Sequence, residues 1–63
     1  MQYPDEMYAE NERRKARWAR EDAAKARISA ANAAAKGNHT AARNLRSWAF
    51  QKELDAEFHE SQI

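Results

Sequence analysis

The chain has 63 residues, with no cysteine, one glycine and one proline. A chain of this length holds one domain at most, and its core seldom suffices without disulfides, a metal, regular helix packing or self-association. The missing cysteines exclude disulfides, thiolate catalysis and cysteine-ligated zinc. Hydrophobic residues make up 43% of the chain, but alanine supplies many of them. The core of a single copy is therefore expected to be thin, which favours self-association.

The formal net charge is only +1, but the charged residues are grouped in blocks along the chain. Residues 5–12 are acidic, residues 13–27 are mainly basic, residues 36–52 are basic and residues 53–60 are acidic again. No stretch approaches the roughly 18 apolar residues of a transmembrane helix. The N-terminus lacks the basic and apolar regions of a secretory signal. We therefore expect a soluble, cytoplasmic protein.

The first predicted element is a long helix over about residues 4–36. Pro4 suits the first position of a helix, because its missing N–H would have no intrahelical partner there. Asp5 follows and complements the positive end of the helix dipole. Lys36 is expected in the last turn as a cation, and Gly37 can take the left-handed conformation that ends a helix.

A second helix is predicted over about residues 39–60, after a turn at Gly37 and Asn38. Asn38 is a favourable N-cap residue for this helix. So short a connection requires the two helices to run antiparallel, side by side. The sequence therefore predicts an all-α protein whose residues 1–63 form one helical-hairpin domain.

Alanines recur in the first helix at alternating spacings of three and four residues, which is typical of two helices packed along their length. These residues are Ala16, Ala19, Ala23, Ala26, Ala30 and Ala33. The matching face of the second helix is expected to hold Ala42, Leu45, Ala49, Ala56 and Ile63. Folding about the turn pairs positions whose residue numbers sum to about 75. We therefore expect Ala26 to face Ala49, and Ala19 to face Ala56.

The same register predicts ion pairs between basic residues of the first helix and acidic residues of the second. It places Arg20 beside Asp55 and Lys15 beside Glu60. Exposed pairs of this kind contribute only about 0–1 kcal/mol each, but they fix the register. They also reduce the positive field of the basic run 12–20, which disfavours a nucleic-acid surface there.

A second set of apolar residues lies away from the helix contact, at about 100° per residue. A lone hairpin buries only one face of each helix, so this set is expected to contact another chain. We expect a homodimer that forms a four-helix assembly, and the alternative is a different partner protein. The two tryptophans have a further alternative, which is packing at the rim of the hairpin. The predicted interface residues are Ile28, Phe50, Leu54, Phe58, Trp18 and Trp48.

Nucleic-acid binding is the alternative function, through basic residues in the middle of the chain and near the turn. A helix-turn-helix reader is disfavoured, because that motif has a longer turn, a steep helix crossing and a third packing element. The residues predicted for nucleic-acid binding are Lys25, Arg27, Arg43 and Arg46.

The sequence contains no evident catalytic or metal-binding arrangement. His39 and His59 lie about 30 Å apart along a helix with a rise of about 1.5 Å per residue, so they are expected on the surface rather than on one metal. The serine and threonine hydroxyls lie near a histidine only where the two residues are close in the sequence. No pattern in the sequence indicates an oxyanion-binding site. We therefore expect a protein that is not an enzyme and has no cofactor.

The stretch 30–49 resembles the interior of a tetratricopeptide hairpin, with a glycine at the turn and small residues at Ala30, Ala42 and Ala49. Large residues of that pattern are replaced, as at Arg46, and no second repeat follows. This resemblance implies the hairpin geometry alone.

As a whole, a cysteine-free hairpin of this length, rich in alanine and arginine, resembles the small early proteins of lambda-like phages. The resemblance is to those encoded between the exonuclease and excisionase genes. It rests on Arg13, Arg14 and Lys15 and on the alanine-rich face. It implies an accessory regulator that favours lytic development by binding host or phage proteins as a dimer, in the host cytoplasm.

Overall fold

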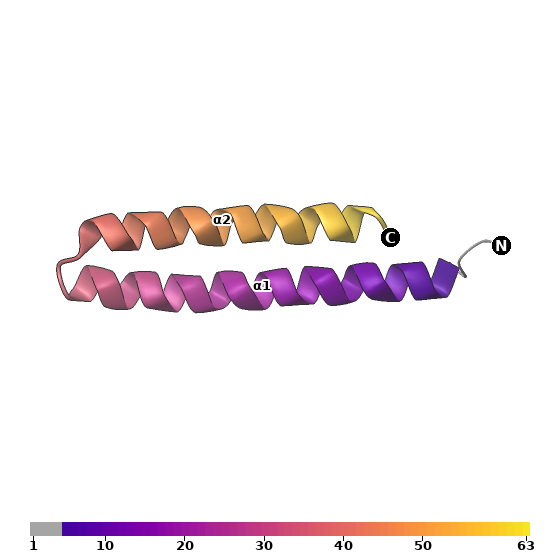
Figure 1. Ribbon diagram of the computed structural model, residues 1–63, viewed down its shortest axis with the longest axis horizontal. Coiled ribbons are helices and arrows are strands. Elements are labelled where there is room, and N and C mark those ends of the chain that lie inside the picture. The colour runs from indigo at the N-terminus through magenta and orange to yellow at the C-terminus, as the bar shows by residue number, and fades with distance from the viewer. Residues whose placement is uncertain (1–4) are drawn as a thin grey trace.

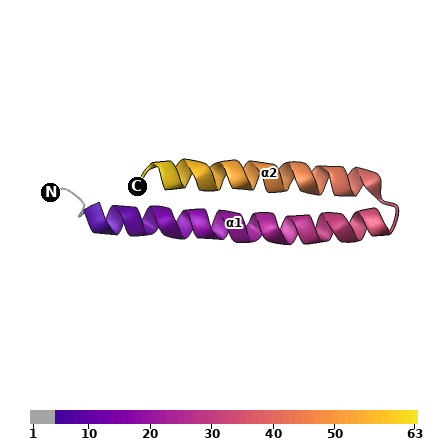
Figure 2. The ribbon, with the colours of Figure 1, turned by 180° about the vertical axis from the view of Figure 1, so that it is seen from behind.

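The computed structural model describes residues 5–63, which form two antiparallel α-helices (Figure 1). Helix α1 spans Asp5–Ala35 and helix α2 spans His39–Ser61. The two views show the helices side by side, with the start of α1 and the end of α2 at the same end of the molecule (Figures 1 and 2). The predicted all-α hairpin is therefore confirmed. Pro4, predicted as the first helical residue, lies outside the described residues.

The turn has the hydrogen bonds of a Schellman motif. Gly37 has a φ of 83°, in the left-handed region predicted for it. Its N–H donates to the carbonyl of Ala34 at 2.9 Å, and the N–H of Asn38 donates to the carbonyl of Ala33 at 2.8 Å. These two bonds satisfy carbonyls that the end of a helix would otherwise leave unpaired. The turn thus ends α1 and reverses the chain within three residues.

The boundaries of the two helices differ slightly from the predicted ones. The sequence predicts Lys36 in the last turn of the first helix, but α1 already ends at Ala35 and no basic residue lies in its last turn. Asn38 caps α2 as predicted, because its side-chain oxygen accepts a hydrogen bond from the N–H of Ala41 at 3.2 Å. Helix α2 continues one residue beyond its predicted end, to Ser61.

The contact between α1 and α2 is made mainly by alanine. Ala42, Ala49 and Ala56 are 0% exposed, and short methyl groups let the helix backbones approach each other closely. We call this row of contacts the alanine seam. The buried apolar residues within residues 6–63 are Ala16, Ala19, Ala23, Ala26, Ala30, Ala42, Ala49 and Ala56.

The register of the seam agrees with the predicted pairing. Ala19 and Ala56 belong to one buried cluster, and Ala26 and Ala49 belong to another. Ile63, predicted for the same face, is 52% exposed because it lies beyond the end of α2. Neither helix, over the described residues, combines the length and apolar character needed to cross a membrane.

Candidate interaction surfaces

A buried carboxylate continues the alanine seam toward the open end of the hairpin. Glu12 is 6% exposed and lies four residues before Ala16, at the seam spacing. Its Oε2 is 2.6 Å from Nδ1 of His59, and its Oε1 is 3.5 Å from Nζ of Lys15. His59 follows Ala56 by three residues and is half-buried. The expectation that His59 is a surface histidine therefore needs correction, since it occupies the seam of α2.

Three glutamates gain favourable partners in the fold, and each has a lowered pKa. The hydrogen bond with His59 is the main cause for Glu12, opposed by desolvation and supported by the charge of Lys15. Hydrogen bonds from Arg27 and Arg20 lower the pKa values of Glu53 and Glu60 respectively. The carboxylates with a lowered pKa are therefore those of Glu12, Glu53 and Glu60.

Acid is therefore expected to destabilise the hairpin through these three carboxylates. A lowered folded-state pKa contributes stability that is present above the unfolded value of about 4.3 and is lost as the pH falls through the folded value. We expect the urea midpoint of the native protein to fall below that pH. In a triple Glu→Gln variant at residues 12, 53 and 60 the midpoint should depend less on pH. An equally steep loss in that variant would show that these contacts do not contribute.

Two arginines of α1 form paired hydrogen bonds with glutamates of α2. Arg20 donates to both carboxylate oxygens of Glu60, at 3.0 and 2.6 Å. Arg27 donates in the same way to Glu53, at 3.1 and 2.6 Å. The arginines are seven residues apart, as are the glutamates, so both pairs lie on one flank of the hairpin. We call this side the arginine flank.

The partners in these ion pairs differ from the predicted ones. Arg20 binds Glu60 rather than Asp55, and Lys15 binds Glu12 rather than Glu60. Side chains tilt toward the N-terminus of their own helix, so Arg20 and Glu60 lean toward each other along the hairpin axis. Asp55 lies about 140° from Glu60 around α2, at about 100° per residue. The numerical register therefore holds for the short alanines but not for long charged side chains.

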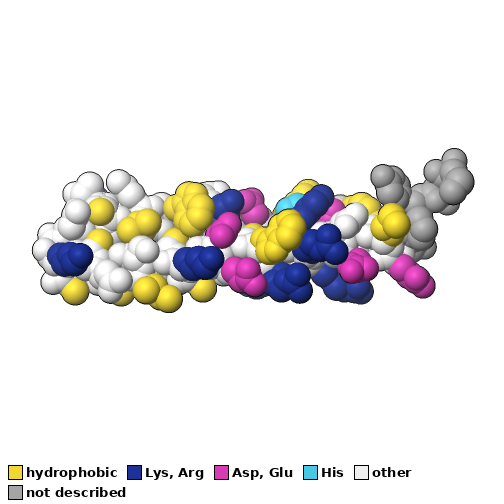
Figure 3. Space-filling view, turned by 60° about the horizontal axis from the view of Figure 1, so that its bottom comes forward, with side chains coloured by type: hydrophobic (Ala, Val, Ile, Leu, Met, Phe, Trp, Pro, Cys, Tyr) yellow, Lys and Arg dark blue, Asp and Glu magenta, His cyan; other side chains and the backbone are white. Residues whose placement is uncertain are grey.

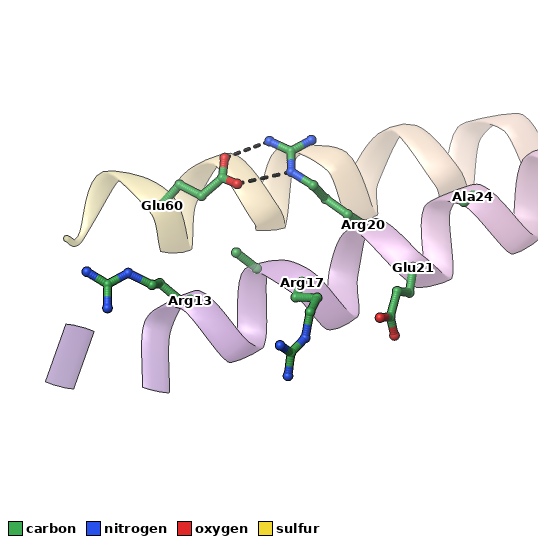
Figure 4. Close-up of a pocket in the computed structure, with 7 residues that line it drawn as sticks. Arg13, Arg17, Arg20, Glu21, Ala24 and Glu60 are labelled. Carbon is green, nitrogen blue, oxygen red and sulfur yellow. Dashed lines mark hydrogen bonds and ion pairs between the residues drawn. The ribbon is translucent and has the colours of Figure 1, made fainter. Parts of the chain in front are cut away.

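An open groove of about 440 Å³ lies on the arginine flank, beside the pair formed by Arg20 and Glu60 (Figure 4). Figure 4 shows the guanidinium groups of Arg13 and Arg17 directed away from that pair. Neither group forms an ion pair with any residue in 6–63. The residues that line the groove are Arg13, Ala16, Arg17, Arg20, Glu21, Ala24 and Glu60.

The predicted interface residues are all exposed, but they do not share one surface. Phe50, Leu54 and Phe58 follow each other every four residues and fall within about 80° around α2, on the side away from α1. We call these three residues the outer stripe. Ile28 is 64% exposed and lies on the outer side of α1, so it faces the opposite direction.

The two tryptophans lie on the flank opposite the arginine flank. Trp18 and Trp48 each precede a buried alanine of the seam, whereas Arg20 and Arg27 each follow one. The Nζ of Lys52 lies 5.2 Å from the ring centroid of Trp48, close enough for a cation–π contact. Both indole rings remain about half exposed. The predicted interface set is thus divided among three surfaces.

The basic residues predicted for nucleic-acid binding are also divided. Arg27 is held by Glu53, which neutralises its charge locally. Lys25 lies about 200° from Arg27 around α1, at about 100° per residue, and so belongs to another side. Arg43 and Arg46 are exposed near the turn. The four side chains therefore do not form one continuous basic patch.

Charges are mixed rather than segregated on the face shown in Figure 3. Basic and acidic side chains alternate over the half that contains the start of α1, and fewer charged groups appear near the turn. Within the described part of the chain, no group of three histidine, aspartate or glutamate side chains is placed to hold a metal ion.

The fold and these surfaces define the class of the protein as an all-α antiparallel hairpin with an alanine seam. No family model matches the chain, and neither a curated protein nor a solved structure matches it. The resemblances to early phage proteins and to tetratricopeptide hairpins therefore remain predictions from the sequence.

Proposed function

We propose that this protein is a non-enzymatic interaction module that self-associates through the outer stripe into a four-helix assembly and binds another protein. The supporting observation is that the buried apolar residues within 6–63 are all alanines, whereas nine large apolar side chains are 42–64% exposed and Leu45 is only half-buried. The exposed large apolar residues are Met7, Tyr8, Trp18, Ile28, Trp48, Phe50, Leu54, Phe58 and Ile63.

On burial, each residue of the outer stripe would contribute more stabilisation than each alanine of the seam does. A fully buried Phe or Leu side chain contributes about 1.5–3 kcal/mol, against about 0.8 kcal/mol for one CH₂ group. The stripe is also self-complementary, because Phe50 and Phe58 each lie four residues from Leu54. A two-fold axis at Leu54 would place Phe50 of one copy against Phe58 of an antiparallel second copy.

The polar part of the same side of α2 favours this antiparallel arrangement. Toward the turn, the outer side carries Thr40, Arg43 and Ser47 instead of apolar residues. In the antiparallel pairing Ser47 lies at the edge of the contact, and Arg43 does not face its own equivalent in the second copy. In a parallel pairing Arg43 would face its own equivalent, which is unfavourable.

The biological setting of the proposal comes from the resemblance to small early proteins of lambda-like phages. That resemblance supports an accessory regulator that acts by binding a host or phage protein. The mixed charge of the arginine flank supports a protein partner over nucleic acid, because Glu53 and Glu60 offset Arg27 and Arg20.

Sedimentation velocity across the micromolar concentration range tests the self-association. We expect a species of twice the chain mass of 7.3 kDa, with the monomer appearing on dilution. A monomer over the whole range would overturn the proposed assembly.

A further inference from the structure

The arginine flank contains a third arginine in the same register as the two that bind glutamate. Arg13, Arg20 and Arg27 follow each other at intervals of seven residues, so the three lie along one line on α1. Arg20 and Arg27 receive carboxylates from α2. Arg13, in contrast, forms no ion pair with any residue in 6–63.

A second arginine that forms no ion pair within residues 6–63 lies beside the first. Arg17 follows Arg13 by four residues, which places their Cβ atoms about 5–6 Å apart on one side of α1. Both arginines line the groove, and Ala16 and Ala24 form part of its apolar lining. A guanidinium group carries five N–H donors in a planar fork that matches a carboxylate. The groove therefore combines two guanidinium groups that form no ion pair within residues 6–63 with the exposed methyl group of Ala24.

We propose that this groove binds an acidic helical segment of the partner protein. Two carboxylates spaced four residues apart on that segment bind Arg13 and Arg17, and a small apolar residue of the segment packs against the exposed methyl group of Ala24. The geometry repeats what the protein does internally, where Glu60 of a neighbouring helix binds Arg20. The inference rests on the proposed role as an interaction module, but not on the dimer.

Two features favour an acidic helix over the other candidate occupants. Glu21 and Glu60 also line the groove, and their negative charges repel a continuous phosphate backbone. A helix, in contrast, can place its carboxylates opposite the arginines alone. A second copy of this chain is disfavoured, because two different two-fold contacts on each copy would build an open chain rather than a closed dimer. The outer stripe already provides the self-complementary contact.

Fluorescence anisotropy with a labelled helical peptide tests the inference. The probe is an alanine-based peptide with glutamates four residues apart, and its control has glutamine at the same positions. We expect the glutamate peptide to bind at low ionic strength and the glutamine peptide to bind much more weakly. The double variant Arg13→Gln with Arg17→Gln should weaken binding about tenfold. The single variant Arg13→Gln should show part of this loss, and its matched control is Arg14→Gln, which removes the same charge from a residue outside the groove that pairs with Glu10.

Three results would overturn the inference: equal binding of both peptides, no loss in the double variant, or displacement of the peptide by a random-sequence DNA duplex at lower concentration than by unlabelled peptide. The variant Leu54→Asp separates this inference from the dimer. It should bind the glutamate peptide like the native protein even if it no longer self-associates. If the native protein proves monomeric but still binds the peptide, only the proposed assembly fails.

Discussion

Replacing Ala49 by leucine is expected to lower the midpoint of thermal unfolding by about 5–20 °C, because overpacking a core costs about 1–3 kcal/mol. Ala49 is 0% exposed and packs in one cluster with Ala23 and Ala26. No neighbouring side chain in that cluster is longer than a methyl group, so no rotamer change can make room for leucine. The helices must move apart and thereby loosen the contacts of the seam. Circular dichroism at increasing temperature measures the effect.

The control for this variant is Asn44→Leu, which adds leucine at an exposed position of the same helix, outside the outer stripe. Substitutions at such a surface position usually change stability within about 0.5 kcal/mol, so the midpoint should stay close to that of the native protein. A midpoint for Ala49→Leu at or above the native value would mean that the helices can separate without loss. In that case the close approach of the alanines does not determine the register.

The turn and the alanine seam are predictable from the sequence because each rests on local geometry. Gly37 and Asn38 have strong conformational preferences for the end and the start of a helix, and both residues adopt them. The seam follows from the spacing of one residue type, and alanine has no side-chain torsion that could alter its contacts. Ala26 and Ala49 therefore meet as the residue numbers predict.

The ion pairs could not be predicted in the same way, because long side chains bind residues that are not directly opposite. Arg20 binds Glu60, which is displaced along the hairpin axis from the residue directly opposite Arg20. The side of the helix on which each residue lies therefore matters as much as its position along the axis. Glu12 and His59 escaped prediction for another reason. Both continue the seam spacing, at four residues before Ala16 and three after Ala56, but a search limited to apolar residues stops before them. Polar residues at seam positions were the available signal.

The predicted interface residues show the limit of reasoning from exposure. Trp18, Ile28 and Leu54 are each exposed as expected, yet they lie on different sides of the hairpin. Hydropathy identifies the apolar residues that a single hairpin leaves exposed. The side of the hairpin on which each of these residues lies depends on how α1 packs against α2. The outer stripe is the one predicted group that forms a continuous line on one helix.

Replacing Leu54 by aspartate is expected to convert the proposed dimer to a monomer at micromolar concentration. Leu54 lies at the centre of the outer stripe, between Phe50 and Phe58, so a two-fold contact would bring two carboxylates together without a cationic partner. The cost of several kcal/mol for each unpaired buried charge corresponds to at least about a hundredfold weaker dimer. Sedimentation velocity measures the change. The far-UV circular dichroism of the monomer should remain helical, because Leu54 makes no contribution to the alanine seam.

The matched control is Ser47→Asp, which adds the same charge to the same side of α2 one heptad closer to the turn. In the antiparallel arrangement Ser47 lies near the edge of the contact, so this variant should remain dimeric. Loss of the dimer in both variants would favour a parallel pairing in which the whole outer side of α2 is buried. A dimer of unchanged stability in Leu54→Asp would instead exclude the outer stripe as the interface. The two tryptophans on the opposite flank from the arginines would then be the next surface to test.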